Sequence, residues 1–172
     1  MQDGSPSPPA LRIAPVAPEL IEGFHAALDA VARERRFLTL LEAPPLPETR
    51  AFVMAGRERG DIRLLALVEG AVVGWVDIQR EPWPSHAHRG HLGIGLLPAW
   101  RGRGFGGTLI AAALDEAWVT GLTRVELTVH ADNAPAIALY ERLGFAREGL
   151  IRRAAIIDGR AVDAILMARL HD

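Results

Sequence analysis

The 172-residue chain lacks cysteine altogether, and this absence removes several kinds of chemistry at once. Without thiols there are no disulfides, no zinc–thiolate or iron–sulfur sites and no cysteine nucleophile. The chain also lacks lysine, since all 19 basic residues are arginine. A lysine Schiff base and the lysine of a P-loop are therefore excluded as well.

Long hydrophobic runs and a strong net charge are missing too. No apolar run reaches about 18 residues, and the opening MQDGSPSPPA has no basic segment followed by an apolar one. The pattern thus predicts neither a membrane span nor a signal peptide. A formal net charge of −2 gives no general attraction to nucleic acid or to an anionic membrane. We expect a cytoplasmic protein with no nucleic-acid or membrane partner.

The composition favours one folded unit. With 49% hydrophobic and 23% charged residues, a chain of this length can bury a substantial core. Residues 1–9 are rich in Ser, Pro and Gly, and we expect them to be disordered. Residues 10–172 contain no internal repeat and no second linker, so they are expected to form a single domain.

Strand and helix patterns alternate along the chain. Together they predict an α/β fold of the α+β type: a mixed, mostly antiparallel central sheet of six to seven strands, flanked by about four helices and containing one parallel crossover. Hairpin turns are expected at Glu69-Gly70 and Asp158-Gly159. Helices are expected at 18–35, 49–60, 105–120 and 133–143; strands are expected at 10–16, 61–69, 71–80, 91–97 and 123–129, followed by two more near the C-terminus.

The stretch RGRGFGG lies between a predicted strand and a predicted helix, where glycine amides can approach a phosphate. Gly102, Gly104 and Gly107 satisfy the G-x-G-x-x-G spacing of a dinucleotide site. However, antiparallel hairpins precede this stretch, and the remaining sequence is too short for repeated parallel crossovers. The NAD-binding interpretation is therefore an alternative rather than the first hypothesis.

With Arg101 included, the same stretch reads Arg101-x-x-Gly104-x-Gly106 after the strand that ends in LLP. This resembles the acyl-CoA signature of the GNAT superfamily of N-acetyltransferases. The resemblance implies that amides of the loop and helix start bind the CoA pyrophosphate. The cofactor-binding residues it predicts here are Arg101, Gly102, Arg103, Gly104, Phe105, Gly106 and Gly107.

A second motif supports the resemblance. VELTVHADNAPAIALYERLGFAREG is similar to a downstream GNAT segment, with its matching positions at Asn133, Ala136, Tyr140, Gly144 and Phe145. The likeness extends from about residue 62 to 170 and is closest to the bacterial branch that acetylates amino acids and related amines. It implies a single GNAT-like domain that moves the acetyl group of acetyl-CoA directly to a primary amine.

Tyr140 and Asn133 each have a role by resemblance and a simpler structural explanation. The resemblance makes Tyr140 the general acid for the CoA sulfur, yet a tyrosine on an apolar helix face is often part of the core. It makes Asn133 a contact of the pantetheine arm. Helix capping also explains Asn133, because Pro135 follows just inside the helix.

The strand HLGIGLL is expected, by resemblance, to part from the following parallel strand. Its backbone would then contact the pantetheine amides through Ile94, Gly95 and Leu96. An ordinary buried strand is the alternative. Gly93 and Gly95 weaken such a strand unless another group approaches closely.

The general base departs from the GNAT pattern. Many relatives carry an acidic residue on this strand, where His91 stands here. A histidine, with an ordinary pKa near 6.5, can accept a proton directly or through water, so His91 is the predicted base. A surface or structural role for His91 is the alternative, and His88, Glu126 and a water chain are weaker candidates for the base.

Two further groups of side chains could form a site. His86, His88 and His91 suggest a metal site, but on a strand His91 would point away from the other two, so no metal is expected. Trp75 and Asp77 lie on one face of a predicted strand, where they could line an acceptor pocket. The alternative is that Asp77 is an exposed acid and Trp75 a packed aromatic.

The sequence leaves the acceptor open. A small-molecule amine is the first hypothesis, while a protein N-terminus and a non-catalytic acyl-CoA-binding regulatory role are alternatives. The C-terminal strands are expected to be able to pair across a homodimer.

Overall fold

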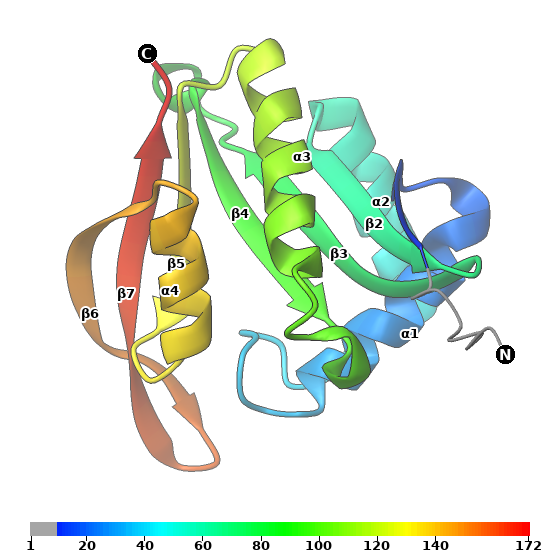
Figure 1. The fold of residues 1–172 in the computed structure, drawn as a ribbon, viewed down its shortest axis with the longest axis horizontal. Coiled ribbons are helices and arrows are strands. Elements are labelled where there is room, and N and C mark those ends of the chain that lie inside the picture. The colour runs from blue at the N-terminus through cyan, green and yellow to red at the C-terminus, as the bar shows by residue number, and fades with distance from the viewer. Residues whose placement is uncertain (1–9) are drawn as a thin grey trace, which may run out of the picture.

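Residues 10–172 are described by a computed structural model, in which one seven-stranded sheet carries helices on both faces (Figure 1). The disorder expected for residues 1–9 lies outside the described residues. The strands are β1 (Leu11–Pro15), β2 (Ile62–Val68), β3 (Ala71–Arg80), β4 (Arg89–Leu96), β5 (Arg124–His130), β6 (Ala146–Ile157) and β7 (Arg160–Leu170). The helices are α1 (Ile21–Ala32), α2 (Leu46–Arg59), α3 (Phe105–Val119) and α4 (Ala134–Arg142), with short 3-10 turns η1 (Pro18–Leu20), η2 (Pro84–His86) and η3 (Pro98–Trp100).

The sheet has the order β1-β2-β3-β4-β5-β7-β6. All neighbouring strands are antiparallel except β4 and β5, which are parallel and joined through α3. Both expected hairpins are present, with left-handed residues at Glu69-Gly70 and at Asp158-Gly159. The predicted α/β fold with a single parallel crossover is therefore confirmed.

The core has one layer on each face of the sheet. Beneath α3 and α4, alternate residues of the central strands form the larger cluster, which includes Leu64, Val76, Leu92 and Leu127. On the other face, α1 and α2 cover a smaller cluster that includes Leu65. Strand β2 is buried along its whole length because helices cover both of its faces.

Two helix boundaries differ from the sequence-based expectation. Helix α2 begins at Leu46 rather than at Thr49, with a proline at the start of its first turn, where a missing N–H does no harm. The helix expected from Pro18 opens as the 3-10 turn η1 and ends at Ala32.

Strands β4 and β5 pair only where they start. Residues 89–91 pair with residues 124–126, and beyond this point β4 continues to Leu96 along β3 alone. Figure 1 shows the two strands diverging from there. We call this opening the fork. The parting of the strands that the sequence predicted is thus present.

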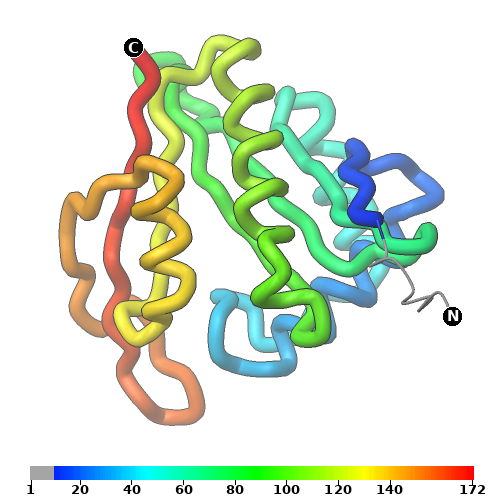
Figure 2. The backbone as a smooth tube through the Cα atoms, in the orientation of Figure 1, coloured from blue at the N-terminus to red at the C-terminus, as the bar shows by residue number. Residues whose placement is uncertain are grey.

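The segment after α1 lies across the open end of the fork, as the backbone trace in Figure 2 shows. At one side Glu34 binds the side chain of Arg101, which follows β4. At the other side the backbone carbonyl of Arg36 contacts Nδ1 of His130, the last residue of β5, at 2.8 Å. Residues 34–36 therefore link the two parted strands.

Candidate active site

The glycine loop leads directly into α3. Gly102 and Gly104 have φ angles of 72° and 83°, and a Cβ on either would meet nothing within 4 Å. These glycines are therefore required by backbone conformation, not by crowding. Gly104 is the N-cap of α3 and supplies no side-chain cap, so the first N–H groups of the helix remain available to an anion.

Gly106 and Gly107 serve a different purpose from the other two glycines. A Cβ on Gly106 would lie 3.2 Å from the side chain of Leu139 on α4, and one on Gly107 would lie 3.6 Å from it. The absence of side chains here lets α3 and α4 approach each other. Phe105 stacks on Trp100 with ring centroids 5.9 Å apart, which fixes the start of the helix.

Both arginines of the loop have contacts within the protein. The guanidinium of Arg101 donates to the carbonyl of Leu96 at 2.9 Å, and its Nη1 donates to Glu34 at 2.8 Å. Arg103 lies over the ring of Trp100 and donates to the carbonyl of Ala99. Arg101 therefore ties the loop to the end of β4 and to the segment after α1.

Ile94, Gly95 and Leu96 form the β4 side of the fork and pair with β3 alone. The glycines of this strand have a clear purpose: a Cβ on Gly95 would overlap the indole of Trp75, and one on Gly93 would lie 2.9 Å from Oδ1 of Asp77. The side chains of Trp75 and Asp77 on β3, rather than a ligand, therefore occupy the space over these two glycines.

Tyr140 lies in the larger core cluster, and only 7% of the residue is exposed. Its ring meets Phe145 edge to face at 5.9 Å. Burial raises the pKa of its phenol to about 12, so the group keeps its proton at any physiological pH. A group that stays protonated suits the role of hydrogen donor.

The ends of α4 fix the position of Tyr140 within it. Asn133 caps the helix by accepting from the N–H of Ala136 at 3.4 Å, which confirms the capping explanation. Gly144, with a φ of 85°, ends the helix, and the N–H of Phe145 returns to the carbonyl of Tyr140 at 3.0 Å.

His91 lies at the end of the paired part of β4, and its side chain is exposed. It stands opposite Gln79 on β3 and Glu126 on β5. His88 is exposed as well and lies before the strand. Neither histidine contacts Tyr140 or the glycine loop in the hydrogen bonds of residues 10–172, so the role of His91 stays a prediction.

Glu126 is held by two arginines. Its carboxylate accepts from Arg89 at 2.7 Å and from Arg124 at 2.8 Å, and Arg124 also binds Glu148. Burial acts to raise the pKa of Glu126, but the hydrogen bonds from Arg124 and Arg89 outweigh it and lower that pKa. A carboxylate so stabilised in its charged form is a weak proton acceptor.

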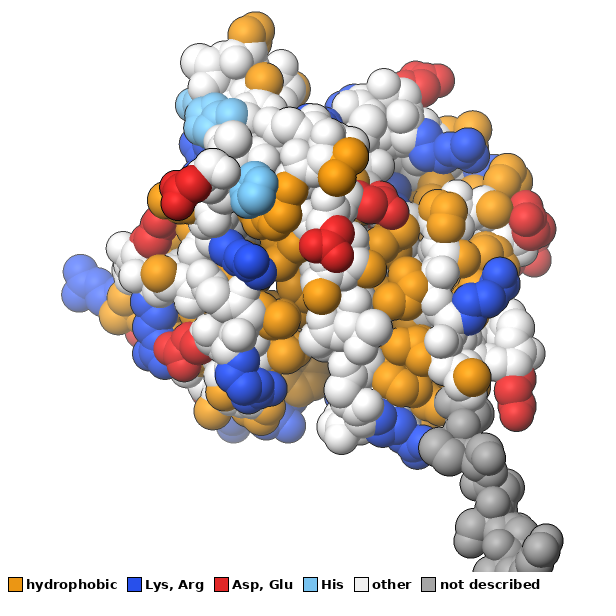
Figure 3. Space-filling view, turned by 45° about the horizontal axis from the view of Figure 1, so that its top comes forward, with side chains coloured by type: hydrophobic (Ala, Val, Ile, Leu, Met, Phe, Trp, Pro, Cys, Tyr) orange, Lys and Arg blue, Asp and Glu red, His pale blue; other side chains and the backbone are white. Residues whose placement is uncertain are grey.

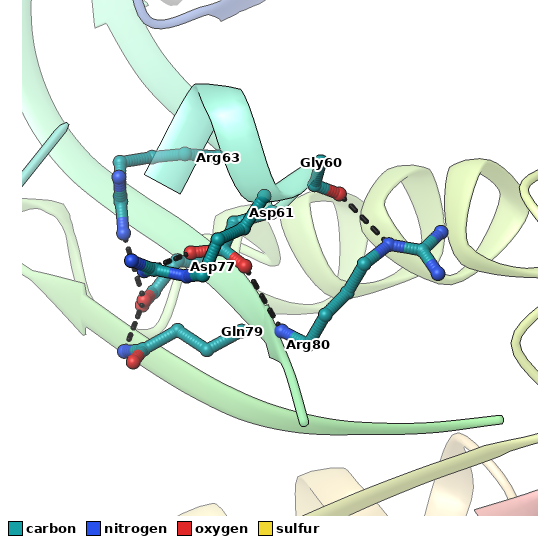
Figure 4. A network of polar contacts seen from close by, with 7 residues as sticks. Gly60, Asp61, Arg63, Asp77, Gln79 and Arg80 are labelled. Carbon is teal, nitrogen blue, oxygen red and sulfur yellow. Dashed lines mark hydrogen bonds and ion pairs between the residues drawn. The ribbon is translucent and has the colours of Figure 1, made fainter. Parts of the chain in front are cut away.

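A polar network that the sequence did not predict surrounds Asp77. One of its carboxylate oxygens, Oδ2, accepts from Arg63 at 3.3 Å and from Gln79 at 2.9 Å, as Figure 4 shows. The side chains of Arg63 and Asp77 are 2% and 10% exposed. Asp61 is bound separately, to Arg59 and to the backbone of Arg80. Asp77 is therefore a buried acid, and the alternative expectation of an exposed acid is wrong.

Among residues 10–172 no group of three or more His, Asp or Glu side chains has metal-binding geometry. Within the same residues, no helix is both long and apolar enough to span a bilayer. On the face drawn in Figure 3, acidic and basic side chains are interspersed and do not form a patch of one sign.

A cavity of about 390 Å³ opens beside the fork. The segment after α1, the end of β5 and the β6–β7 hairpin enclose it. Arg35 is paired with Asp158 at its rim through two bonds, at 2.9 and 2.5 Å. The lining residues are Arg35, Arg36, His130, Asp132, Ile157, Asp158, Arg160 and Val162. Three arginines against two aspartates give this cavity a formal charge of +1 and hence a positive character.

Parts of the chain are similar in sequence to several known proteins. Over 110 residues the chain is 36% identical to the L-amino acid N-acetyltransferase AaaT of Escherichia coli, covering 63% of this chain and 67% of the relative. It is 39% identical over 104 residues to the N-alpha-acetyltransferase RimI of Mycobacterium tuberculosis, covering 58% and 60%. The match to the mycothiol acetyltransferase of Corynebacterium aurimucosum, 49% identical, spans 31% of this chain and only 17% of that protein.

Solved structures share the fold. A GNAT-family acetyltransferase from Streptococcus pneumoniae superposes with a TM-score of 0.88 at 29% identity, covering 94% of this chain and 100% of the other. YncA from Salmonella typhimurium, solved with acetyl-CoA, gives a TM-score of 0.89 at 19% identity and covers 95% of each chain. Residues 27–145 match the model of the acetyltransferase (GNAT) family. The chain therefore belongs to the GNAT acetyltransferases, a family of enzymes that take their acyl group from acetyl-CoA.

Proposed function

We propose that the protein transfers the acetyl group of acetyl-CoA directly to the primary amine of a small molecule, an amino acid or a related amine. The observation that carries this proposal is the fork between β4 and β5, which ends beside the uncapped start of α3. An extended thioester can lie along the free edge of β4 while its pyrophosphate meets the glycine loop. The amine then approaches from the face covered by α1 and α2.

The donor would be held mainly by backbone groups. The N–H groups that follow Gly104 point along the axis of α3 and favour a pyrophosphate, since the helix dipole adds to their partial charge. Ile94 and Leu96 would offer the free side of β4 to the pantetheine amides. We assign Arg101 the task of shaping this loop, because its guanidinium is already bound to Leu96 and Glu34.

Tyr140 would donate a hydrogen bond to the thiolate that leaves. A thiol has an ordinary pKa of about 8.5, so a phenol with a pKa of about 12 loses roughly 5 kcal/mol if it hands over its proton completely. We infer that Tyr140 stabilises the developing negative charge on sulfur as a donor. The sulfur then takes up the proton that the amine releases, so that CoA leaves as the thiol.

The positive cavity beside the fork suits an acceptor that carries a carboxylate. Arg36 and Arg160 line it, and the planar guanidinium group matches a carboxylate with two parallel hydrogen bonds. The AaaT relative, named for L-amino acids, supports the same acceptor class. We propose that this cavity holds the anionic end of the acceptor.

A peptide N-terminus is the second candidate acceptor, favoured by the RimI relative. It differs in length and charge: a peptide must continue past the cavity, whereas a free amino acid ends in it. Polyamines and aminoglycosides carry no carboxylate, so Arg36 and Arg160 would not contribute to their binding.

The test is release of free CoA from acetyl-CoA across matched acceptors. Each amino acid is compared with its amide and with a peptide that starts with it, in the wild type and in an Arg36→Ala variant. We expect turnover of the free amino acid, a KM at least tenfold higher for its amide, and loss of this preference in Arg36→Ala. Better turnover of peptides would contradict the proposal in favour of the second candidate.

Tyr140→Phe is the control for catalysis. A variant that binds acetyl-CoA as tightly as the wild type but turns over at least a hundredfold more slowly supports the assigned role. Tight binding of CoA without turnover of any amine by the wild type would favour a regulatory acyl-CoA-binding role. The cytoplasmic location and the homodimer stay predictions.

A further inference from the structure

The residues nearest the fork show which acid can reach an amine there. The last pair between β4 and β5 joins His91 to Glu126, and Gly93 is the second residue beyond it. The side chains of His91 and of positions 93 and 95 face the side of the sheet covered by α1 and α2. A group that lies over Gly93 on this face therefore stands where the two strands part.

Asp77 is that group. It pairs with Gly93 in the register of β3 and β4, and its Oδ1 would lie 2.9 Å from a Cβ on that glycine. The side chain thus leans over the backbone of β4 at the point where any other residue would block it. Its second oxygen, Oδ2, takes the bonds from Arg63 and Gln79, as Figure 4 shows. Oδ1 is therefore the oxygen that lies over Gly93, the residue of β4 at the fork.

We propose that Asp77 is a catalytic residue that accepts the proton of the acceptor's ammonium group, directly or through one water molecule. The inference rests on the proposed function and adds a base on β3 where the sequence placed His91 on β4. The ammonium gives one proton to the carboxylate, and the freed lone pair on nitrogen attacks the thioester carbon. The C–S bond breaks, the second proton of the nitrogen passes to the thiolate that leaves, so that an amide and CoA form, and Asp77 returns its own proton to solvent.

The surroundings of Asp77 suit a base better than those of the other acids. Burial raises the pKa of Asp77, and the charge of Arg63 and the hydrogen bonds from Gln79 and Arg63 oppose this effect only in part. Glu126, by contrast, has its carboxylate committed to two arginines and a lowered pKa. The charged or titratable groups around Asp77 are Arg63 on β2, Asp61 just before β2, and His91 on the same face of β4.

Gly93 also explains how Asp77 can occupy this position. A glycine in a central strand weakens it, and its place here is explained because a Cβ would strike the carboxylate of Asp77. The position of the Asp77 carboxylate over β4 therefore depends on the missing side chain of Gly93.

The test measures kcat/KM against pH for the best acceptor with the wild type and Asp77→Asn, together with the affinity for acetyl-CoA. We expect kcat/KM at neutral pH to fall about a hundredfold or more, the fall in rate on the acid side to disappear, and acetyl-CoA affinity to stay within about threefold. Asp61→Asn is the matched control, because Asp61 is a buried acid nearby whose carboxylate binds Arg59 and the backbone of Arg80 instead.

Gly93→Ala is the second variant and keeps the carboxylate. It should reproduce the loss of kcat/KM because its Cβ displaces Oδ1, and it decides the question if Asp77→Asn fails to fold. The inference is overturned if Asp77→Asn, or Gly93→Ala in its place, keeps wild-type kcat/KM, or if His91→Gln alone abolishes the acid-side fall. Absence of any turnover by the wild type would instead contradict the proposed function.

Discussion

Glu34 and Arg101 form a two-pronged ion pair between the segment after α1 and the glycine loop. Both Nη atoms of Arg101 donate to the carboxylate of Glu34, one of them at 2.8 Å. The guanidinium also lies over the ring of Phe37, 5.1 Å from its centroid. The residue that opens the CoA signature is thus also the one that attaches the segment across the open end of the fork.

Glu34→Gln should weaken both the loop and the fold. The two side chains are 25% and 33% exposed, so we expect a loss of about 1 kcal/mol in the free energy of unfolding. The KM for acetyl-CoA should rise severalfold because Arg101 loses an anchor. Urea unfolding and initial rates check this. Glu42→Gln, at an exposed pair 3.5 Å from Arg33, should change neither quantity.

Gly104→Ala should impair binding of acetyl-CoA. The φ of 83° is unfavourable for a residue with a Cβ, so we expect a loss of roughly 1 kcal/mol in stability or a shift of the first amides of α3. Calorimetric titration with CoA measures the effect. Gly104→Asn should be milder because asparagine tolerates this conformation. Equal affinity in Gly104→Ala and the wild type would remove the loop from the pyrophosphate site.

Tyr140 should govern alkaline unfolding. Its phenol titrates at about 12 in the folded protein and near 10 when unfolded, so stability is intact below pH 10 and falls as the pH rises towards 12. The fall amounts to roughly 3 kcal/mol. Because Tyr140 is the only tyrosine in the chain, phenolate absorbance reports Tyr140 alone. Tyr140→Phe should lack this fall, and titration near pH 10 in the folded protein would contradict the prediction.

Glu126→Gln should reduce stability without abolishing catalysis. The lowered pKa of Glu126 means that its contribution is present above about pH 4.3 and is lost as the pH falls through the folded value. We expect a loss of about 2 kcal/mol at neutral pH and a flatter acid limb of the stability curve. Thermal melts from pH 3 to 7 measure this. A hundredfold lower kcat would instead mark Glu126 as the base.

Ile156→Arg should disrupt the homodimer that we expect through the C-terminal strands. Ile156 is 71% exposed on β6, the last strand of the sheet, where Leu150 is also exposed. An arginine at this position destabilises a dimer in which the strand is buried, and it leaves the stability of the monomer unchanged because the position is exposed to water there. Sedimentation at several concentrations checks the assembly. Val119→Arg, at a site 88% exposed on α3, is the control. A wild-type monomer at every concentration would contradict the expectation.

Local signals determined much of this fold in advance. The cap at Asn133, the glycine stop at Gly144 and the two hairpin turns depend on residues close in sequence, and all four are present. The two spaced motifs indicated the GNAT family because each joins a glycine or cap residue to a helix start. Such signals survive in a single sequence because the hydrogen bonds that cause them are local.

Only the tertiary structure decided the polar contacts across the sheet. A regular hairpin around Glu69-Gly70 would set Asp77 opposite Ile62, but a bulge between Ala66 and Leu67 shifts the register so that Asp77 faces Arg63. A bulge of one residue leaves no clear signal in a buried apolar strand. The polar network around Asp77 could therefore be found only in the tertiary structure.

The sequence alone thus determined the family, the glycine loop and the helix that carries Tyr140, because short-range patterns encode them. The fold decided that Asp77 lies over Gly93, that Glu126 is bound by two arginines, and that Arg101 turns to Glu34. These contacts join strands and loops far apart in the chain. Their geometry depends on strand register, on burial and on the fork between β4 and β5. None of these can be predicted from residues that are close together in the sequence.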